Sequence, residues 1–204
     1  MCSLYKTQDS EIPEPTSKKT GWYHKENQKV VTVIKRFGND LDFTNQTIEY
    51  MRLERFVNSK NYWIGLDKLS RLTRYSKAKL NVTFHSLIDN NYYTLCFKDF
   101  QVKNRKESYR IFLTGTESRT SKISDMHNGM PFTDNSSCAV FYECPNWFSN
   151  IICQRFQWFC KMVDAEFNEC GDNCKEKYSY VMMYSTEGEQ WHPVKSFHVQ
   201  MYFD

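Results

Sequence analysis

The sequence is poor in glycine, lacks a long apolar run and has no strong excess of charge of either sign. Only 7 of its 204 residues are glycine, so the chain is neither fibrous nor of low complexity. No run reaches the roughly 18 apolar residues that cross a bilayer, and residues 1–20 contain no apolar stretch of signal-peptide length. We therefore expect no membrane span, and a secretion leader is not present in this chain.

The charge balance argues against a nucleic-acid partner. The 27 Lys and Arg residues and the 24 Asp and Glu residues give a formal net charge of only +3. Nucleic-acid binding surfaces are strongly and one-sidedly basic, so no nucleic acid is expected. The densest basic stretch, Lys68–Lys79, alternates its charges with Leu69, Leu72 and Tyr75. We interpret it as a solvated face, with contact to an anionic partner as the alternative.

Cysteine is concentrated in one part of the chain, because six of the 8 cysteines fall between Cys138 and Cys174. Disulfides, a zinc site or a reactive thiol could each explain the cluster. None of the six has the C-x2-C spacing typical of zinc sites, and His127 and His192 lie outside the cluster, which favours disulfides. Disulfides persist only in an oxidising compartment, so the cysteines favour a secreted protein. An intracellular structural or zinc-binding protein is the alternative.

The hydrophobic pattern predicts an α+β fold. Residues 1–20 are interpreted as a flexible arm and residues 21–204 as one domain. A helix is predicted over 44–57, and a buried strand at 61–66 leads into a short helix at 67–75. Further strands are predicted at 30–37, 79–89, 92–102, 109–116 and 195–203, the middle three as an antiparallel meander. Residues 116–194, here called the C-terminal subdomain, show little periodicity.

The order of these pieces resembles that of fibrinogen-related domains. That family shows a TVIQRR-x-DGS-x-DF stretch followed by EFWLG-x-DKIHxLT, and this chain has TVIKRFGNDLDF at 32–43 and NYWIGLDKLSRLT at 61–73. The similarity continues in DFQV at 99–102, YRIFLTG at 109–115, HNGMPFT at 127–133, Cys138-Ala139, Asn146-Trp147-Phe148 and VKSFHVQMYF at 194–203. The resemblance implies a fibrinogen C-terminal-like domain with a central antiparallel sheet, short helices and a disulfide-stapled C-terminal subdomain.

The resemblance also implies a function. Such a domain would be a non-enzymatic, lectin-like, extracellular recognition module that binds a carbohydrate, an acetylated group or a protein receptor through its C-terminal subdomain, often as a homo-oligomer. No G-x-S-x-G, H-E-x-x-H, P-loop or C-x-x-C motif suggests an enzyme. The candidate ligand-binding residues are His127, Asn128, Trp147, Phe148, Tyr178 and Trp191. Core packing is the alternative for each aromatic residue, and Trp63 and Asp67 are interpreted as structural.

Two departures from the family bear on disulfides and calcium. The resemblance implies a Cys138–Cys153 disulfide, whereas the pairing of the other cysteines stays open, with a buried free thiol as one of the alternatives for Cys96. The family's acid-rich calcium loop is reduced to PFTDNSSC at 131–138. Calcium takes about six to eight oxygen ligands, and Asp134 with serine hydroxyls supplies few of them. We therefore expect that the calcium site is lost and that no cofactor is bound.

The chain contains three N-glycosylation sequons. They begin at Asn45, Asn81 and Asn135 and are compatible with a glycosylated exterior. Chance alone would supply about two such motifs in a chain of this composition, so they add little to the case for secretion.

Overall fold

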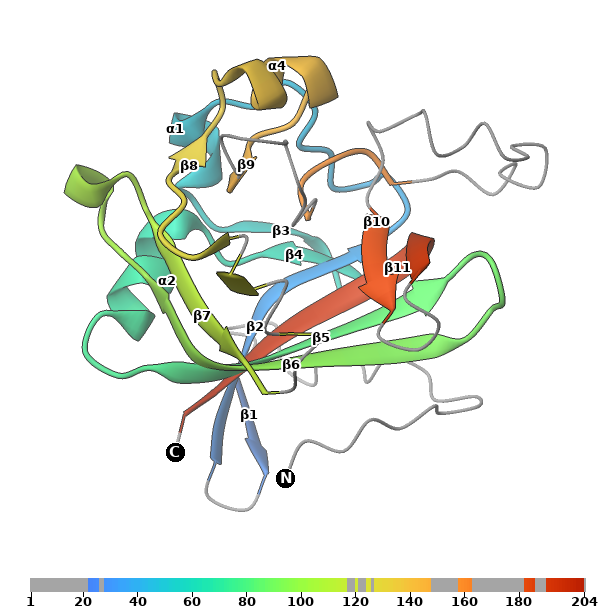
Figure 1. The fold of residues 1–204 in the computed structure, drawn as a ribbon, viewed down its shortest axis with the longest axis horizontal. Helices are drawn as coiled ribbons and strands as arrows, with labels where there is room; N and C mark the ends of the chain where they lie inside the picture. The colour runs from blue at the N-terminus through green and yellow to red at the C-terminus, as the bar shows by residue number, and fades with distance from the viewer. Residues whose placement is uncertain are drawn as a thin grey trace.

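The computed structural model describes residues 22–25, 28–116, 120, 124–125, 127–147, 158–162, 182–185 and 190–203, with the backbone alone at 22–25, 28–29, 182–185 and 190–191. Within these residues a nine-stranded antiparallel sheet forms the body, and most of the short helices lie on one side of it (Figure 1). A separate two-stranded ribbon belongs to the C-terminal subdomain. The α+β class and the fibrinogen-like arrangement expected from the sequence are confirmed.

The strands are numbered in the order in which they occur along the chain. Those of the large sheet are β1 (Trp22–Lys25), β2 (Gln28–Phe37), β3 (Arg55–Asn58), β4 (Asn61–Trp63), β5 (Ala78–Ser86), β6 (Tyr92–Val102), β7 (Ile111–Gly115), β10 (Met182–Ser185) and β11 (Gln190–Phe203). The ribbon consists of β8 (Phe132–Thr133) and β9 (Asn146–Trp147). The described helices are α1 (Ile48–Met51), α2 (Leu66–Thr73), α4 (Ser137–Tyr142) and the 3-10 helix η1 (Arg105–Glu107).

The last strand of the chain lies in the middle of the sheet. The strand order is β3-β4-β2-β11-β5-β6-β7, with β1 pairing with β2 and β10 pairing with β11. Met201 of β11 lies opposite Val31 of β2 on one side and opposite Leu80 of β5 on the other. The predicted meander β5–β6–β7 and the predicted final strand are both confirmed. β11 therefore joins the first part of the chain to the meander.

The helix predicted over 44–57 is wrong in length. Only Ile48–Met51 is α-helical, and Arg55–Asn58 forms the edge strand β3, in which Arg55 pairs with Trp63 of β4. The helix begins after Thr47, whose side chain accepts a hydrogen bond from the Tyr50 backbone N–H. Pairing with β4 and the close approach of Gly65 behind residue 52 override the helical pattern, as tertiary contacts often do.

The segment NYWIGLDKL at 61–69 packs into the core, as expected. Trp63 is fully buried, and its Nε1 donates to the Met51 carbonyl at 2.9 Å. Its ring lies edge-on to Phe43 and to Phe159, with centroids 6.5 and 4.9 Å away. Edge-to-face aromatic pairs add stabilisation beyond their buried area. Trp63 thus links the sheet, the α1 turn and the C-terminal subdomain.

Residue 65 must be a glycine, because its backbone φ is positive and other backbone atoms lie close to it. Its φ of +84° lies in a region that side chains rarely adopt. A Cβ at this position would lie 2.6 Å from the Arg52 carbonyl oxygen and 2.6 Å from the Leu53 carbonyl carbon. Both contacts are with backbone, which cannot swing aside. The glycine therefore allows the start of α2 to pack against the turn that ends α1.

A buried arginine holds the C-terminal subdomain against β2. Arg36 is fully buried, and its Nη1 donates to the carbonyls of Trp158 and Cys160 at 2.9 and 2.6 Å. Asn39 adds a reciprocal pair with Met162, donating to its carbonyl at 3.0 Å and accepting from its N–H at 2.9 Å. Residues 158–162 are therefore fixed to the end of β2 by four hydrogen bonds.

We predict that Gly65→Ala is far more destabilising than Gly38→Ala. Gly38 also has a positive φ, of +63°, but nothing lies within 4 Å of a Cβ built on it. Gly38→Ala should therefore cost only the left-handed penalty of about 1–2 kcal/mol, whereas Gly65→Ala adds overpacking and should cost about 2–5 kcal/mol. Urea unfolding followed by tryptophan fluorescence measures both. Equal losses in the two variants would contradict the packing role of Gly65.

Candidate functional site

The turn at 127–129 covers the edge strand β7. Asn128 accepts a hydrogen bond from the Leu113 N–H through its Oδ1 at 2.8 Å, and the Gly129 N–H donates to the Ile111 carbonyl at 2.8 Å. Gly129 has a φ of +76°, which a glycine adopts without strain. An uncovered edge strand presents open N–H and C=O groups to other chains. Here the turn forms hydrogen bonds with the Leu113 N–H and the Ile111 carbonyl of β7.

The turn also contacts the core of the C-terminal subdomain. His127 and Trp147 are both buried, and the His127 Nδ1 lies 3.3 Å from the Trp147 carbonyl. The indole N–H of Trp147 donates to the Tyr109 carbonyl at 2.7 Å, and its ring is edge-on to Phe132 at 4.9 Å. The structure thus brings two predicted ligand-binding residues together, within the core. Ligand contact by them stays a prediction.

The other predicted site residues are placed only in part. Phe148 and Tyr178 lie outside the described residues, and Trp191 belongs to β11 but its side chain is not described. Their roles in ligand binding stay predictions.

The sequon asparagines lie at different depths. Asn45 and Asn135 are exposed, whereas Asn81 is partly buried within β5, between β6 and β11. Glycosylation at the three positions stays a prediction.

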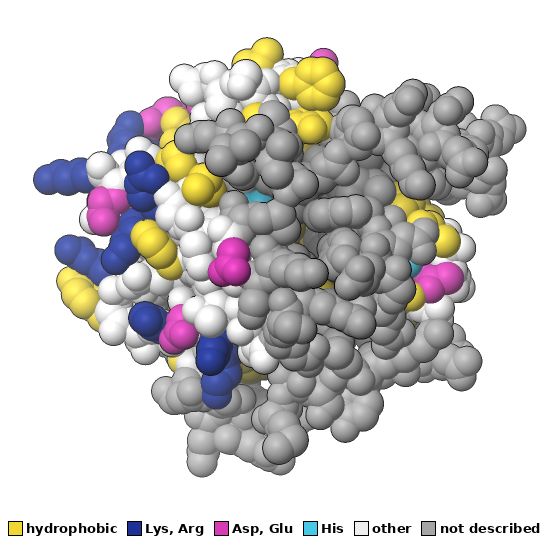
Figure 2. All heavy atoms as spheres, in the orientation of Figure 1, with side chains coloured by type: hydrophobic (Ala, Val, Ile, Leu, Met, Phe, Trp, Pro, Cys, Tyr) yellow, Lys and Arg dark blue, Asp and Glu magenta, His cyan; other side chains and the backbone are white. Residues whose placement is uncertain are grey.

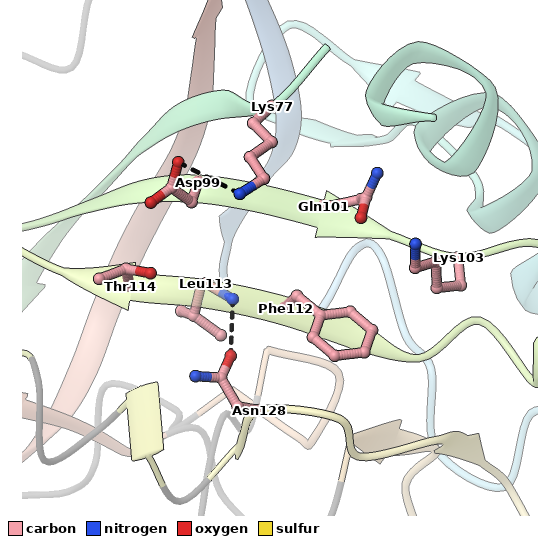
Figure 3. A pocket seen from close by; sticks show the side chains of 8 residues that line it. All are labelled: Lys77, Asp99, Gln101, Lys103, Phe112, Leu113, Thr114 and Asn128. Carbon is pink, nitrogen blue, oxygen red and sulfur yellow. Dashed lines mark hydrogen bonds and ion pairs between the residues drawn. The ribbon is translucent and has the colours of Figure 1, made fainter. Parts of the chain in front are cut away.

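A pocket of about 420 Å³ lies beside Asn128 on the outer face of β6 and β7, and we call it the β6–β7 trough. Asp99 and Gln101 of β6 and Lys103, which follows it, alternate with the buried Phe100 and Val102, and the three line the outer face together. Its lining consists of Lys77, Asp99, Gln101, Lys103, Phe112, Leu113, Thr114 and Asn128 (Figure 3). The trough is not predictable from the sequence, because alternating polar residues look the same on any solvated strand face.

A β-bulge shapes the trough. Asp99 has a φ of +57°, and the pairing of β6 with β7 shifts register between Lys98 and Gln101. Bulges redirect side chains and are frequent near functional sites. The Asp99 carboxylate lies 3.7 Å from the Lys77 ammonium, and the Lys103 ammonium lies 5.6 Å from the centroid of the Phe112 ring. The lining therefore carries two ammonium groups and one carboxylate.

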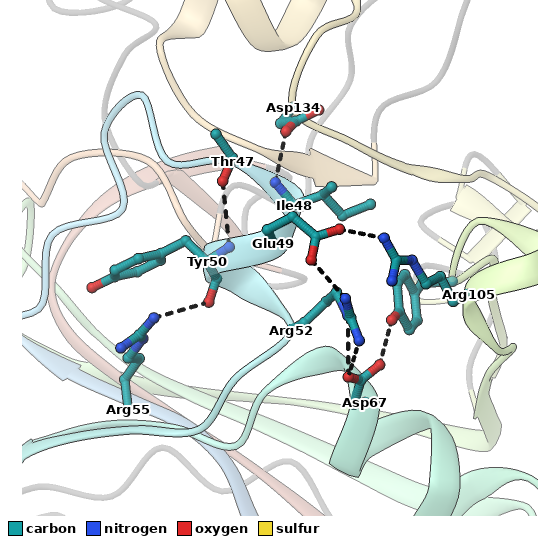
Figure 4. Close-up of polar contacts among 10 residues, drawn as sticks. Thr47, Ile48, Glu49, Tyr50, Arg52, Arg55, Asp67, Arg105 and Asp134 are labelled. Carbon is teal, nitrogen blue, oxygen red and sulfur yellow. Dashed lines mark hydrogen bonds and ion pairs between the residues drawn. The ribbon is translucent and has the colours of Figure 1, made fainter.

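Asp67 has the structural role that the sequence suggested. Its carboxylate accepts hydrogen bonds from the Tyr109 hydroxyl and from the Arg52 guanidinium, at 3.1 Å from Nε and 3.0 Å from Nη2 (Figure 4). Glu49 bridges Arg52 and Arg105. Burial raises the pKa of Asp67, but the bonds from Tyr109 and Arg52 outweigh it and hold the pKa below its usual value. Burial and the bond to Asp67 raise the pKa of Tyr109 to about 12. The network joins α1, α2 and the η1 turn.

Asp134, the acid left from the family's calcium loop, contacts a helix terminus. Its Oδ2 accepts from the Ile48 N–H at 2.6 Å, at the start of α1. A carboxylate at this position satisfies one of the open N–H groups of a helix. Among the residues that the structure describes, no group of three or more His, Cys, Asp or Glu side chains could hold a metal ion. The loss of calcium binding stays a prediction.

The described cysteines are oxidised. Cys144 and Cys160 form a disulfide with a Cα–Cα distance of 5.0 Å, and Cys96 and Cys138 are also disulfide-bonded. Of the alternatives that the sequence leaves open for Cys96, the structure therefore shows a disulfide and not a free thiol. Cys153 lies outside the described residues, so its pairing with Cys138 stays a prediction. Three thiols of the proposed zinc cluster are occupied by sulfur bonds.

Comparison with known proteins identifies relatives of this arrangement. The family model of the C-terminal globular domain of fibrinogen beta and gamma chains matches residues 21–203. Protein scabrous of Drosophila melanogaster is 27% identical over 152 residues, which are 68% of this chain and 18% of that protein. Human Tenascin-N is 30% identical over 125 residues, 57% of this chain and 10% of that protein. The chain thus spans less than a fifth of either relative.

Solved structures share the fold at low identity. The fibrinogen-like globe domain of human ANGPTL2 has a TM-score of 0.61 at 16% identity, covering 98% of this chain and 92% of that one. Lamprey fibrin D-dimer, complexed with the peptide ligand Gly-His-Arg-Pro-amide, has a TM-score of 0.64 at 15% identity, covering 89% and 63%. No helix among the described residues is long and apolar enough to cross a membrane.

We predict that Asn128 stabilises the fold through its acceptor oxygen. Asn128→Ala leaves the N–H of the buried Leu113 without this partner and should lower the free energy of unfolding by about 1–3 kcal/mol. Asn128→Asp keeps an oxygen at the same place and should cost less than about 1 kcal/mol. Urea unfolding of the two variants measures the difference. An alanine variant as stable as the wild type would contradict this role.

Proposed function

Because the chain belongs to the family of C-terminal globular domains of fibrinogen beta and gamma chains, we propose that it is a non-enzymatic, extracellular recognition module. It binds a protein or carbohydrate ligand through its C-terminal subdomain. The observation that carries the proposal is the oxidised state of Cys96, Cys138, Cys144 and Cys160. Structural disulfides form and persist outside the reducing cytosol, so oxidation supports an extracellular site of action.

The anchoring of the C-terminal subdomain supports binding. The Cys144–Cys160 disulfide ties the segment at 158–162 to the end of α4, and Arg36 and Asn39 tie the same segment to the sheet. A surface that is already fixed loses less conformational entropy when a ligand binds. The peptide in the lamprey fibrin D-dimer structure supports a protein end as one ligand class. A carbohydrate or acetylated group is the alternative.

One serine–histidine pair among the described residues has the spacing of a catalytic pair, but it is buried, which supports a non-enzymatic role. The Ser86 hydroxyl lies 2.8 Å from the Nδ1 of His192, as a nucleophile and its base would. Both residues are buried, and the Ser86 oxygen also accepts from the Ile88 N–H at 3.1 Å. Burial and desolvation lower the pKa of His192, while Asp89 opposes this shift. The pair fixes the end of the β5–β6 hairpin and offers a substrate no access.

We predict that the double variant Cys144→Ser, Cys160→Ser weakens both stability and ligand binding. The two residues are 16 apart in sequence, and opening such a loop should cost about 3 kcal/mol in the free energy of unfolding. The wild type, secreted in oxidised form, should bind saturably to one member of a panel of amine-terminated peptides and N-acetylated sugars. The serine variant should lose at least about tenfold in affinity, because the binding surface is no longer pre-organised.

Val82→Ala serves as the control for this experiment. Val82 is fully buried in β5, where it lies opposite Leu95 of β6 and Val199 of β11, and it takes no part in the disulfide or the four hydrogen bonds that hold residues 158–162. Its truncation should cost stability without changing the affinity. Calorimetry on samples that circular dichroism shows to be folded compares the three proteins. Absence of saturable binding by the oxidised wild type, or equal affinity of wild type and serine variant, would overturn the proposal.

A further inference from the structure

We propose that the β6–β7 trough is a second binding site, which takes a sulfated sugar unit of an anionic polysaccharide. The site lies on the outer face of the sheet edge and is additional to the ligand site proposed for the C-terminal subdomain. Three features of the trough carry the inference: its charge, its covered strand edge and its fixed polar groups.

The charge of the trough and its rim is predominantly positive. Lys77 and Lys103 face the pocket, with Asp99 as the opposing carboxylate (Figure 3). Figure 2 shows Lys and Arg side chains gathered on the side of the molecule that carries α2, β7 and the η1 turn. The exposed basic residues of this region are Arg71, Arg74, Lys77, Lys98, Arg105, Lys106 and Arg110, and the exposed acidic residues near them are Glu49, Asp67, Glu107 and Asp125, of which Glu49 pairs with Arg105. Such a field attracts an extended polyanion.

The two pocket lysines differ in their ion pairing. Lys77 is 64% exposed and only loosely paired with Asp99, at 3.7 Å. Lys103 has no carboxylate partner within the described part of the chain, and its ammonium lies near the Phe112 ring at 5.6 Å. An ammonium group is a compact point charge without the fork geometry that matches carboxylates, so lysines suit sulfate groups in varied orientations. The lining thus fits a sulfated ligand.

The covered edge of β7 disfavours a peptide. An extended peptide binds a sheet edge by continuing the backbone hydrogen-bond ladder. At β7 the Ile111 N–H donates to the Met130 carbonyl, the Ile111 carbonyl accepts from Gly129, and the Leu113 N–H is taken by Asn128. A glycan needs no such ladder, because it binds through charges, hydrogen bonds and ring contacts. The covered edge therefore favours a sugar over an acidic peptide strand.

The polar groups around the pocket are held in place. Gln101 donates through its Nε2 to the Thr73 and Arg74 carbonyls at 3.2 and 3.1 Å, and Asn128 is fixed by the Leu113 N–H. The Phe112 ring gives one side of the pocket an apolar surface on which a sugar ring can rest. The volume of about 420 Å³ lies within the range of small-ligand sites. The trough therefore has the size and the fixed polar groups of a binding site.

Asp99 limits the affinity of the site. Its carboxylate occupies Lys77 and repels an incoming sulfate group, so its removal should strengthen binding. Asn tolerates a left-handed backbone better than most residues, and Asp99→Asn therefore suits the φ of +57° at this position. The trough thus offers variants with opposite expected effects on one measured affinity.

The test uses a size-defined, sulfated heparin oligosaccharide as the probe and its desulfated, N-acetylated form as the comparison. The variant Lys77→Gln, Lys103→Gln should bind the sulfated probe about tenfold more weakly, as expected for two exposed charge contacts. The control variant Lys60→Gln, Lys195→Gln removes the same amount of charge outside the trough. Lys60 lies in the turn between β3 and β4, and Lys195 lies in β11. The affinity of this control variant should stay within about twofold of the wild type. Asp99→Asn should bind severalfold more tightly.

Four results would overturn the inference: no saturable binding of the sulfated probe, equal losses in the two lysine variants, equal binding of the desulfated probe, or tighter binding of a polyglutamate peptide than of the sulfated probe. Thermal unfolding of each variant shows that its fold is kept. Failure of the ligand panel for the C-terminal subdomain leaves these measurements unaffected, since Lys77 and Lys103 line the trough and make none of the four hydrogen bonds that hold residues 158–162. The two proposals can therefore fail separately.

Discussion

The attachment of residues 158–162 to β2 through the buried guanidinium of Arg36 is the interaction on which the other features of the C-terminal subdomain depend. Burial lowers the pKa of Arg36 to about 9, a shift that Asp42 opposes, and the group stays charged at neutral pH. Two carbonyls and the face of Phe43, 5.2 Å from the guanidinium carbon, surround it. Removing a partner from a buried charge is costly. This contact places Cys160 where it meets Cys144 and positions Phe159 against Trp63.

The turn at 127–129 connects the two regions that we propose for binding. His127 points into the aromatic core of the C-terminal subdomain, where it meets the Trp147 carbonyl, while Asn128 lines the β6–β7 trough. Neighbouring residues of one short turn thus contact the buried core of the C-terminal subdomain and the trough. The large sheet supports both regions, because β11 joins β2 to the meander whose edge strand β7 the turn covers.

The sequence predicted the features that depend on local pattern. Alternating residues in β5 and β6 and the β-branched run in β2 fit a pleated, half-buried surface, and all three segments form strands. The pattern failed at 44–57, where pairing with β4 overrides helix propensity. It could not show that Asp134 caps α1 or that Asn128 fixes Leu113, because both contacts join residues 15 or more positions apart. The trough escaped notice because a bulge at Asp99 and a lysine before β5 meet only in three dimensions.

A peptide map of the secreted protein, digested without reduction, tests the account most directly. We predict that the peptide containing Cys144 is found linked to the peptide containing Cys160, and that neither cysteine takes up an alkylating label. Recovery of both cysteines as alkylated thiols from folded protein, or about one zinc ion per chain in the same sample, would contradict an oxidised extracellular domain with a disulfide-fixed C-terminal subdomain.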